Sequence, residues 1–260
     1  MKRLLCVLLL AFSLPAFPAA NGDERVLAAR DAVQRGDRAK LAKQLEAVRG
    51  HELEPYVEYW LLRLRLEEAG AAELREFLAR QAGSYLAEKL RGEWLKVLGK
   101  RREWDAFDAE YPPLVQTDQE ITCYALQNRL RLADLGALDE ARPLWFTPAD
   151  LPESCIPLME QLLADKRLGT DDIWERLRRL LEAKKPGAAK ATAAYLPVGQ
   201  APSAKTLDAI ADKPLRHLAL QPSNFASSRQ GREMALFAVQ RLARTDPVQA
   251  AQQWEGIKDK

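Results

Sequence analysis

The residues that could do chemistry are few and scattered in this chain of 260 residues, which contains two histidines. The run His51-Glu52-Leu53-Glu54 begins like the H-E-x-x-H motif of zinc proteases, but Pro55 occupies the position of the second histidine. The other histidine, His217, lies between leucines and is more typical of a half-buried packing residue than of a catalyst. We therefore interpret His51 as a surface loop residue and predict no metal site and no cofactor.

Carboxylates are plentiful, with 37 Asp and Glu residues, so counting alone leaves a paired-carboxylate glycosidase as an alternative. That chemistry needs one acid with a raised pKa in a shaped cleft. Most acidic residues here stand beside Arg or Lys, as in the pair Glu175-Arg176, and we expect such pairs to lie on solvated helix faces. The sequence also lacks the G-x-S-x-G, P-loop and G-x-G-x-x-G motifs, so no residue is assigned as catalytic or cofactor-binding.

Six tryptophans, at positions 60, 94, 104, 145, 174 and 254, could stack on sugar rings. Most of them lie within apolar helical stripes. We therefore predict that the tryptophans mainly belong to the core.

The composition favours helices. The chain has 42 Leu and 41 Ala against 22 Val, Ile and Thr combined, and the first two residue types favour helix over strand. Lys and Arg number 39, and two of them, Lys2 and Arg3, lie in the segment that we expect to be removed. The remaining chain is formally neutral, which argues against nucleic acid as a partner.

The first twenty residues have the pattern of a secretory signal peptide. A basic head, Met1 to Arg3, precedes an apolar run from Leu4 to Leu14 and a break rich in Pro and Ala, with cleavage predicted after Ala20. The apolar run is too short to cross a hydrocarbon core of about 30 Å. Since no later stretch is long and apolar enough, we predict no transmembrane anchor and a mature chain, residues 21–260, in the bacterial periplasm.

From Asp23 onward the pattern is one short amphipathic helix after another, about fourteen in all, joined by turns rich in Gly and Pro. The clearest apolar stripe holds Ile173, Leu177, Leu180 and Leu181, and a helix is predicted from 121 to 135. No long alternating pattern predicts a strand. The fold class is all-α, an irregular α-solenoid or superhelix of stacked short helical hairpins.

Two cysteines remain after the predicted cleavage, Cys123 and Cys155. In an oxidising compartment an even pair of cysteines predicts a disulfide, and two unrelated buried thiols are the alternative. Closing a loop of about 33 residues stabilises a protein by about 3.5–4 kcal/mol in the chain-entropy model.

Three segments together resemble the bacterial soluble lytic murein transglycosylases. The first is Leu53-Glu54-Pro55-Tyr56-Val57-Glu58-Tyr59, and the second is Arg102-Glu103-Trp104-Asp105-Ala106-Phe107. The third and most specific combines Cys123-Tyr124-Ala125, Gly136, Glu140-Ala141, Leu144-Trp145, Leu151-Pro152 and Cys155. The similarity runs from about residue 23 to the C-terminus, within the family's N-terminal superhelical, U-shaped domain.

The resemblance implies a periplasmic enzyme that cleaves peptidoglycan between N-acetylmuramic acid and N-acetylglucosamine and leaves a 1,6-anhydromuramyl end. In the family, the catalytic glutamate lies in a lysozyme-like C-terminal domain, in a Glu-Ser motif followed by G-L-M-Q. Here Glu153-Ser154 is followed by Cys155 and no G-L-M-Q occurs, so we interpret Glu153 as a residue at a helix start beside the disulfide. No catalytic residue is carried over.

We therefore expect residues 21–260 to be the N-terminal part of a longer enzyme. Its expected partners are peptidoglycan glycan strands and the enzyme's own C-terminal catalytic domain, and its expected role is architecture and glycan placement. A free-standing periplasmic helical-repeat scaffold for other proteins is the alternative. A self-contained glycosidase ranks last.

Overall fold

A computed structural model describes the backbone of residues 19–259 and the side chains of residues 22–259. Residues 1–18, which make up most of the predicted signal peptide, lie outside the described residues. Ala20 falls within the first turn of the first described helix. The signal peptide and its cleavage after Ala20 stay predictions.

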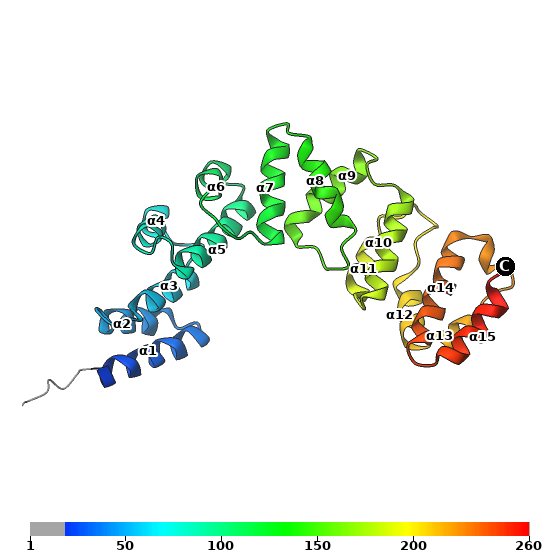
Figure 1. Cartoon of the computed structure of the whole chain (residues 1–260), viewed down its shortest axis with the longest axis horizontal. Helices are drawn as coiled ribbons and strands as arrows, with labels where there is room; N and C mark the ends of the chain where they lie inside the picture. The colour runs from blue at the N-terminus through cyan, green and yellow to red at the C-terminus, as the bar shows by residue number, and fades with distance from the viewer. Residues whose placement is uncertain (1–18, 260) are drawn as a thin grey trace, which may run out of the picture. The chain divides into compact units, whose positions relative to one another are not determined.

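The described chain divides into two compact units, one up to Gln116 and one from Thr117 onward. The helices of the first unit are α1 (Ala19–Gln34), α2 (Arg38–Ala47), α3 (Glu54–Leu64), α4 (Ala71–Arg80), α5 (Tyr85–Arg101) and α6 (Trp104–Glu110). Figure 1 shows them from blue to cyan-green.

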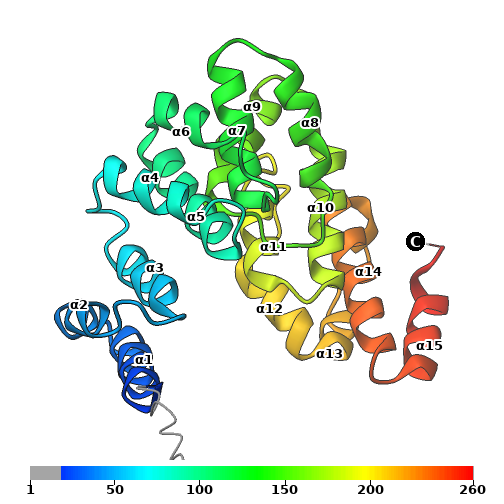
Figure 2. The ribbon, with the colours of Figure 1, turned by 60° about the vertical axis from the view of Figure 1, so that its left-hand side comes forward.

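The second unit contains nine α-helices and two short 3-10 helices. They are α7 (Gln119–Arg131), α8 (Gly136–Trp145), η1 (Glu153–Cys155), α9 (Ile156–Ala164), α10 (Thr170–Glu182), α11 (Pro186–Ala193), α12 (Ala204–Asp212), α13 (Pro214–Ala219), η2 (Phe225–Ser227), α14 (Arg229–Ala243) and α15 (Pro247–Ile257). Successive helices such as α7 and α8, or α14 and α15, lie side by side in Figures 1 and 2.

The core of each unit follows the apolar stripes of its helices. In α1, Val26, Ala29 and Ala32 are buried at a spacing of three residues, and their small side chains allow close packing. In α10 the predicted stripe from Ile173 to Leu181 is buried. The described residues contain no strand, and the all-α fold class of stacked short helices is confirmed.

Many of these helices begin where the sequence supplies a capping residue or a proline. The side chains of Asp37, Ser84, Asp118, Ser203, Ser228 and Asp246 each accept a hydrogen bond from a backbone N–H in the first turn of α2, α5, α7, α12, α14 and α15, respectively. Proline stands in the first turn of α3, α9, α11, α13 and α15, where the missing N–H costs nothing.

The helix predicted from 121 to 135 ends earlier, at Arg131. Ala133 adopts a left-handed conformation with φ 64°, which stops the helix. The turn is held by Asp134, whose carboxylate accepts hydrogen bonds from the Arg129 side chain at 2.8 Å and from the Gly136 N–H at 3.0 Å. Two polar contacts thus stabilise a conformation that apolar periodicity alone does not reveal.

Cys123 and Cys155 form a disulfide with a Cα–Cα distance of 5.0 Å, and both residues are fully buried. The bond joins the middle of α7 to the end of η1. Next to it, the Ser154 hydroxyl donates to the Glu120 carbonyl at 3.0 Å. The disulfide therefore ties two segments that are 32 residues apart in the sequence.

Over the part of the chain that the structure covers, no helix combines the length and the apolar character that crossing a membrane requires.

Gly231, in the first turn of α14, is expected to tolerate no side chain. A Cβ atom at this position would lie 1.9 Å from the carbonyl oxygen of Phe225 in η2, a backbone atom that cannot move alone. We expect Gly231→Ala to lower the free energy of unfolding by about 1–3 kcal/mol, as overpacking does. Urea unfolding would measure it, with Gly256→Ala, where nothing lies nearby, as the control. Equal midpoints for the two variants would contradict the close approach.

Candidate functional site

His51 lies in the turn between α2 and α3 and holds that turn against α1. Its Nδ1 accepts a hydrogen bond from the Leu53 N–H at 3.1 Å, so its Nε2 carries the proton that faces Asp23 Oδ1 at 3.2 Å. Across the described residues, no group of three or more His, Cys, Asp or Glu side chains is arranged to hold a metal ion.

His217 is half-buried in α13. The side-chain nitrogen of Gln221 can only donate, and it lies 2.6 Å from His217 Nε2, so this ring nitrogen is the acceptor. Burial lowers the pKa of His217 below its usual value of 6.5. The imidazole is therefore neutral at pH 7.

This pKa makes stability depend on pH in a defined direction. As the pH falls through about 6.5, His217 binds a proton more readily in the unfolded chain than in the folded chain, so the free energy of unfolding decreases. We expect His217→Gln to flatten this decrease between about pH 7.5 and about pH 5.5, measured by urea unfolding. His51→Gln, which removes the other histidine, should keep the decrease, and an unchanged slope in His217→Gln would contradict the prediction.

The tryptophans are buried or half-buried, as the apolar stripes predict, except for Trp254. Trp94, Trp145 and Trp174 are buried, whereas Trp60 and Trp104 are half-buried. Trp254, in α15, is 39% exposed.

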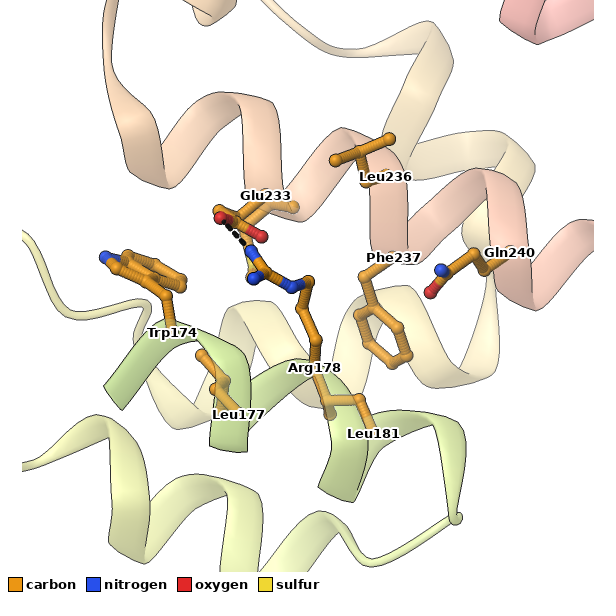
Figure 3. A pocket seen from close by; sticks show the side chains of 9 residues that line it. Trp174, Leu177, Arg178, Leu181, Glu233, Leu236, Phe237 and Gln240 are labelled. Carbon is orange, nitrogen blue, oxygen red and sulfur yellow. Dashed lines mark hydrogen bonds and ion pairs between the residues drawn. The ribbon is translucent and has the colours of Figure 1, made fainter. Parts of the chain in front are cut away.

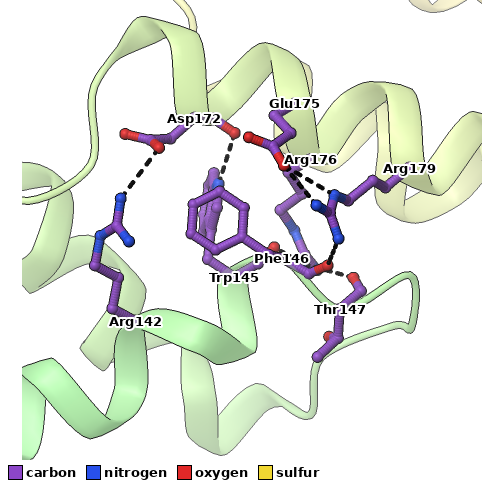
Figure 4. A network of polar contacts seen from close by, with 8 residues as sticks. All are labelled: Arg142, Trp145, Phe146, Thr147, Asp172, Glu175, Arg176 and Arg179. Carbon is purple, nitrogen blue, oxygen red and sulfur yellow. Dashed lines mark hydrogen bonds and ion pairs between the residues drawn. The ribbon is translucent and has the colours of Figure 1, made fainter.

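Trp145, part of the third segment of the resemblance, is the centre of a polar network between α8 and α10 (Figure 4). Its ring nitrogen donates to the Asp172 carbonyl at 2.8 Å. The Arg176 guanidinium lies over the Trp145 ring, 5.2 Å from its centroid. Arg176 also donates to the carbonyls of Trp145, Thr147 and Ala149, which satisfies the end of α8 and the loop after it.

Arg176 corrects one expectation from the sequence. It is 3% exposed, so the prediction that the Glu175-Arg176 pair lies on a solvated helix face is wrong for this residue. Burial lowers the pKa of Arg176. The sequence contained a signal for it, because Arg176 follows Ile173 by three residues and precedes Leu180 by four, on the apolar face of α10.

The surrounding arginines extend the network over the protein surface. Arg142 pairs with Asp172 at 3.3 Å, and Arg179 donates to the Phe146 carbonyl at 2.9 Å. Both arginines also lie over the Phe146 ring. Because these groups are paired with one another, we interpret the network as a structural junction between α8 and α10.

Glu233 is a buried carboxylate between α10 and α14 (Figure 3). It pairs with Arg178 at 2.6 Å and lies 3.6 Å from Arg229, and it lines a cavity of about 10 Å³. That volume holds about one water molecule. A sugar ring does not fit there.

Glu153, the acidic residue of the single Glu-Ser pair, is exposed at the start of η1. Its neighbour Ser154 is buried and bonded to the Glu120 carbonyl. The position is that of a helix-start residue beside the disulfide.

A cleft of about 480 Å³ opens between α2, α3 and α4 in the first unit, and its size is that of a small-ligand site. Its lining residues are Leu45, Glu46, Arg49, Glu54, Pro55, Glu58, Arg80 and Gln81. Three of them, Glu54, Pro55 and Glu58, belong to the first segment of the resemblance. We call this set the α2–α4 cleft.

Charges of both signs meet in the α2–α4 cleft. Arg80 pairs with Glu58 and with Glu76, the latter at 2.8 Å, and Arg49 pairs with Glu46 at 3.0 Å. Glu54 accepts a hydrogen bond from the Gly50 N–H at 2.6 Å. The lining holds three carboxylates and two guanidinium groups, and both guanidinium groups are paired with carboxylates, so the arrangement offers hydrogen-bond donors and acceptors to a neutral polar ligand such as a sugar.

Tyr59 lies on α3, the helix that also contributes residues to the α2–α4 cleft. Its hydroxyl lies 3.3 Å from both oxygens of Glu93, and burial together with that carboxylate raises the pKa of Tyr59 to about 12. Tyr59 is thus a neutral hydrogen-bond donor that joins α3 to α5.

No pattern in the sequence indicates the two arginines of the α2–α4 cleft, Arg49 and Arg80. Arg80 follows Glu58 by 22 residues, and no local pattern links them. Arg80 and Glu58 meet because α3 and α4 both pack on α5.

No protein-family sequence model and no curated protein matches this chain. Solved structures do. An inactive mutant of the lytic transglycosylase Slt from Pseudomonas aeruginosa has 25% sequence identity and a TM-score of 0.62, over 89% of this chain and 37% of that chain.

Two further structures give the same result. The 70-kDa soluble lytic transglycosylase from Escherichia coli has 18% identity and a TM-score of 0.64, over 92% of this chain and 39% of that chain. A complex of the 70-kDa soluble lytic transglycosylase with bulgecin A has 20% identity and a TM-score of 0.64, over 91% of this chain and 38% of that chain.

This chain thus spans 37% to 39% of the length of these relatives. The three segments of the resemblance lie at the start of α3, in the turn that leads into α6, and across α7, α8 and η1. The resemblance that they indicate is confirmed, and the chain has the fold of the helical superhelical domain of the soluble lytic transglycosylases.

Proposed function

We propose that this chain is the helical, non-catalytic part of a peptidoglycan lytic transglycosylase, where it places glycan strands for cleavage to 1,6-anhydromuramyl ends. It acts in the periplasm after removal of residues 1–20 and works with a lysozyme-like catalytic domain. The observation that carries the proposal is the similarity in fold over 89% of the chain to a lytic transglycosylase at 25% identity.

Two features of the chain support this proposal. The buried Cys123–Cys155 disulfide fits an oxidising compartment such as the periplasm. The α2–α4 cleft supplies paired polar groups beside the segment that resembles the family, and neutral sugar hydroxyls suit such groups.

Sedimentation with purified murein sacculi tests the proposal. The mature chain, residues 21–260, is expected to pellet with sacculi and to release no 1,6-anhydromuropeptides detectable by mass spectrometry. A chain that stays in the supernatant would contradict glycan placement and favour the alternative, a periplasmic scaffold for proteins. Released anhydromuropeptides would show that the helices contain a catalytic acid and would contradict the non-catalytic role.

A variant in the α2–α4 cleft sharpens the test. Arg80→Ala removes a donor that lines the cleft, and we expect it to weaken binding to sacculi by about five- to ten-fold, the effect of one hydrogen bond of about 1 kcal/mol. Arg30→Ala removes the same charge from an exposed position on α1 and is the matched control. Equal losses in the two variants would indicate general charge attraction instead of a site.

A further inference from the structure

A further cavity, of about 280 Å³, opens on the surface of the second unit, where α12, α13, η2 and the start of α14 meet. We call it the α13–α14 cavity. Its volume is at the lower limit of small-ligand pockets, so it suits a small molecule or one group of a larger one.

The lining of the α13–α14 cavity carries no carboxylate, lysine or arginine. This is notable in a chain of which 29% is charged. His217, which lines the cavity, is neutral at pH 7 because burial lowers its pKa. Three arginines adjoin lining residues in the sequence, Arg216, Arg229 and Arg232, and none of them lines the cavity. Arg229 pairs with Asp171 and lies over the Trp174 ring, and Arg232 donates to the Ala226 carbonyl. The lining therefore favours an uncharged ligand.

The polar part of the lining holds side-chain amides, His217 and the hydroxyls of Thr206, Ser227 and Ser228, and the Thr206 and Ser228 hydroxyls are engaged in hydrogen bonds within the chain. Gln221 donates to His217 through its nitrogen, so its carbonyl oxygen is an available acceptor. Asn224 and Gln230 also line the cavity, and within the part of the chain whose side chains are described their amides have no hydrogen-bond partner. A side-chain amide offers one acceptor and two donors, which matches a ligand that has both a C=O and an N–H.

The apolar part of the lining is buried. Phe225 and Met234 are buried, at 9% and 3% exposure, and both line the cavity. The carbonyl of Phe225 lies so close to Gly231 that a Cβ atom there would be 1.9 Å away. The backbone of η2 thus lies close against α14 at this point, and the two side chains offer an apolar surface for a methyl group.

We propose that the α13–α14 cavity binds an uncharged acetamido group, with the amide of the ligand at Gln221, Asn224 and Gln230 and its methyl group against Phe225 and Met234. The inference rests on the proposed function for the source of this group. In peptidoglycan the acetamido group of an N-acetylated sugar is one source, and the amide of a stem-peptide alanine is the other.

Ligand-observed saturation-transfer NMR on the mature chain distinguishes the possibilities. The probes are N-acetylglucosamine, glucose and N-acetylalanine methylamide. We expect N-acetylglucosamine to bind at least about ten-fold more tightly than glucose, because glucose lacks the amide and the methyl group. Tighter binding of N-acetylalanine methylamide would support the same chemistry and assign the peptide as its source. Equal binding of glucose, or no binding of either acetamido compound, would overturn the inference.

Gln230→Leu locates the binding site. It keeps the size of the side chain and removes its free amide, so binding of the acetamido probe should fall by about ten-fold. Gln252→Leu makes the same change on the exposed face of α15 and should leave binding unchanged. Equal binding to both variants would overturn the inference. If the acetamido probes do not bind but the chain still pellets with sacculi, the inference fails while the proposed function stands.

Discussion

Replacing Arg176 by methionine is expected to lower the free energy of unfolding by about 3 kcal/mol. The guanidinium donates to three backbone carbonyls, those of Trp145, Thr147 and Ala149. Methionine fills much of the same space but leaves these carbonyls without their donor in a region that Arg176 keeps from water. Urea unfolding monitored by circular dichroism would measure the loss.

Arg179→Met is the matched control for this prediction. Arg179 lies on the same helix and also donates to a carbonyl, that of Phe146, but it is exposed. Water can replace an exposed donor, so we expect a loss below about 1 kcal/mol. If the two variants lose equal stability, the burial of Arg176 does not matter energetically and the network is not the junction that we describe.

Reducing the Cys123–Cys155 disulfide is expected to lower the free energy of unfolding by about 3.5–4 kcal/mol. The bond closes a loop between residues 32 positions apart, so its loss increases the conformational entropy of the unfolded chain. The measurement is the urea midpoint of the mature chain with and without dithiothreitol, because these two cysteines are the only ones in residues 21–260.

The double variant Cys123→Ala, Cys155→Ala provides the control. It should be less stable than the oxidised chain and should not respond to dithiothreitol, since it has no bond to reduce. An unchanged midpoint on reduction of the wild-type chain would contradict the prediction.

Local signals in the sequence predicted most of the fold. The stripe from Ile173 to Leu181 gives α10 its buried face, and Pro55 stands in the first turn of α3 as expected. The boundary at Arg131 was missed, because it depends on a left-handed Ala133 that Asp134 stabilises through contacts with Arg129 and Gly136.

The candidate sites were less predictable than the helices. The α2–α4 cleft brings Glu58 and Arg80 together from two helices, and the α13–α14 cavity draws on four elements. Their formation depends on how neighbouring helices pack, which hydrophobic periodicity does not specify. Arg176 was the exception, since its position on the apolar face of α10 was visible in the sequence and was interpreted as solvated.

In both units, most helices pack on helices that follow or precede them closely in the chain. In such an arrangement a pair of neighbouring helices can unfold without the rest of the chain. Native-state hydrogen exchange should therefore show separate protection levels for pairs such as α10 with α11 and α14 with α15. For the same reason, a substitution changes the packing only of the helices close to it. Each hairpin can accumulate changes without disturbing distant ones, and this explains how the fold persists in relatives with 18% to 25% sequence identity.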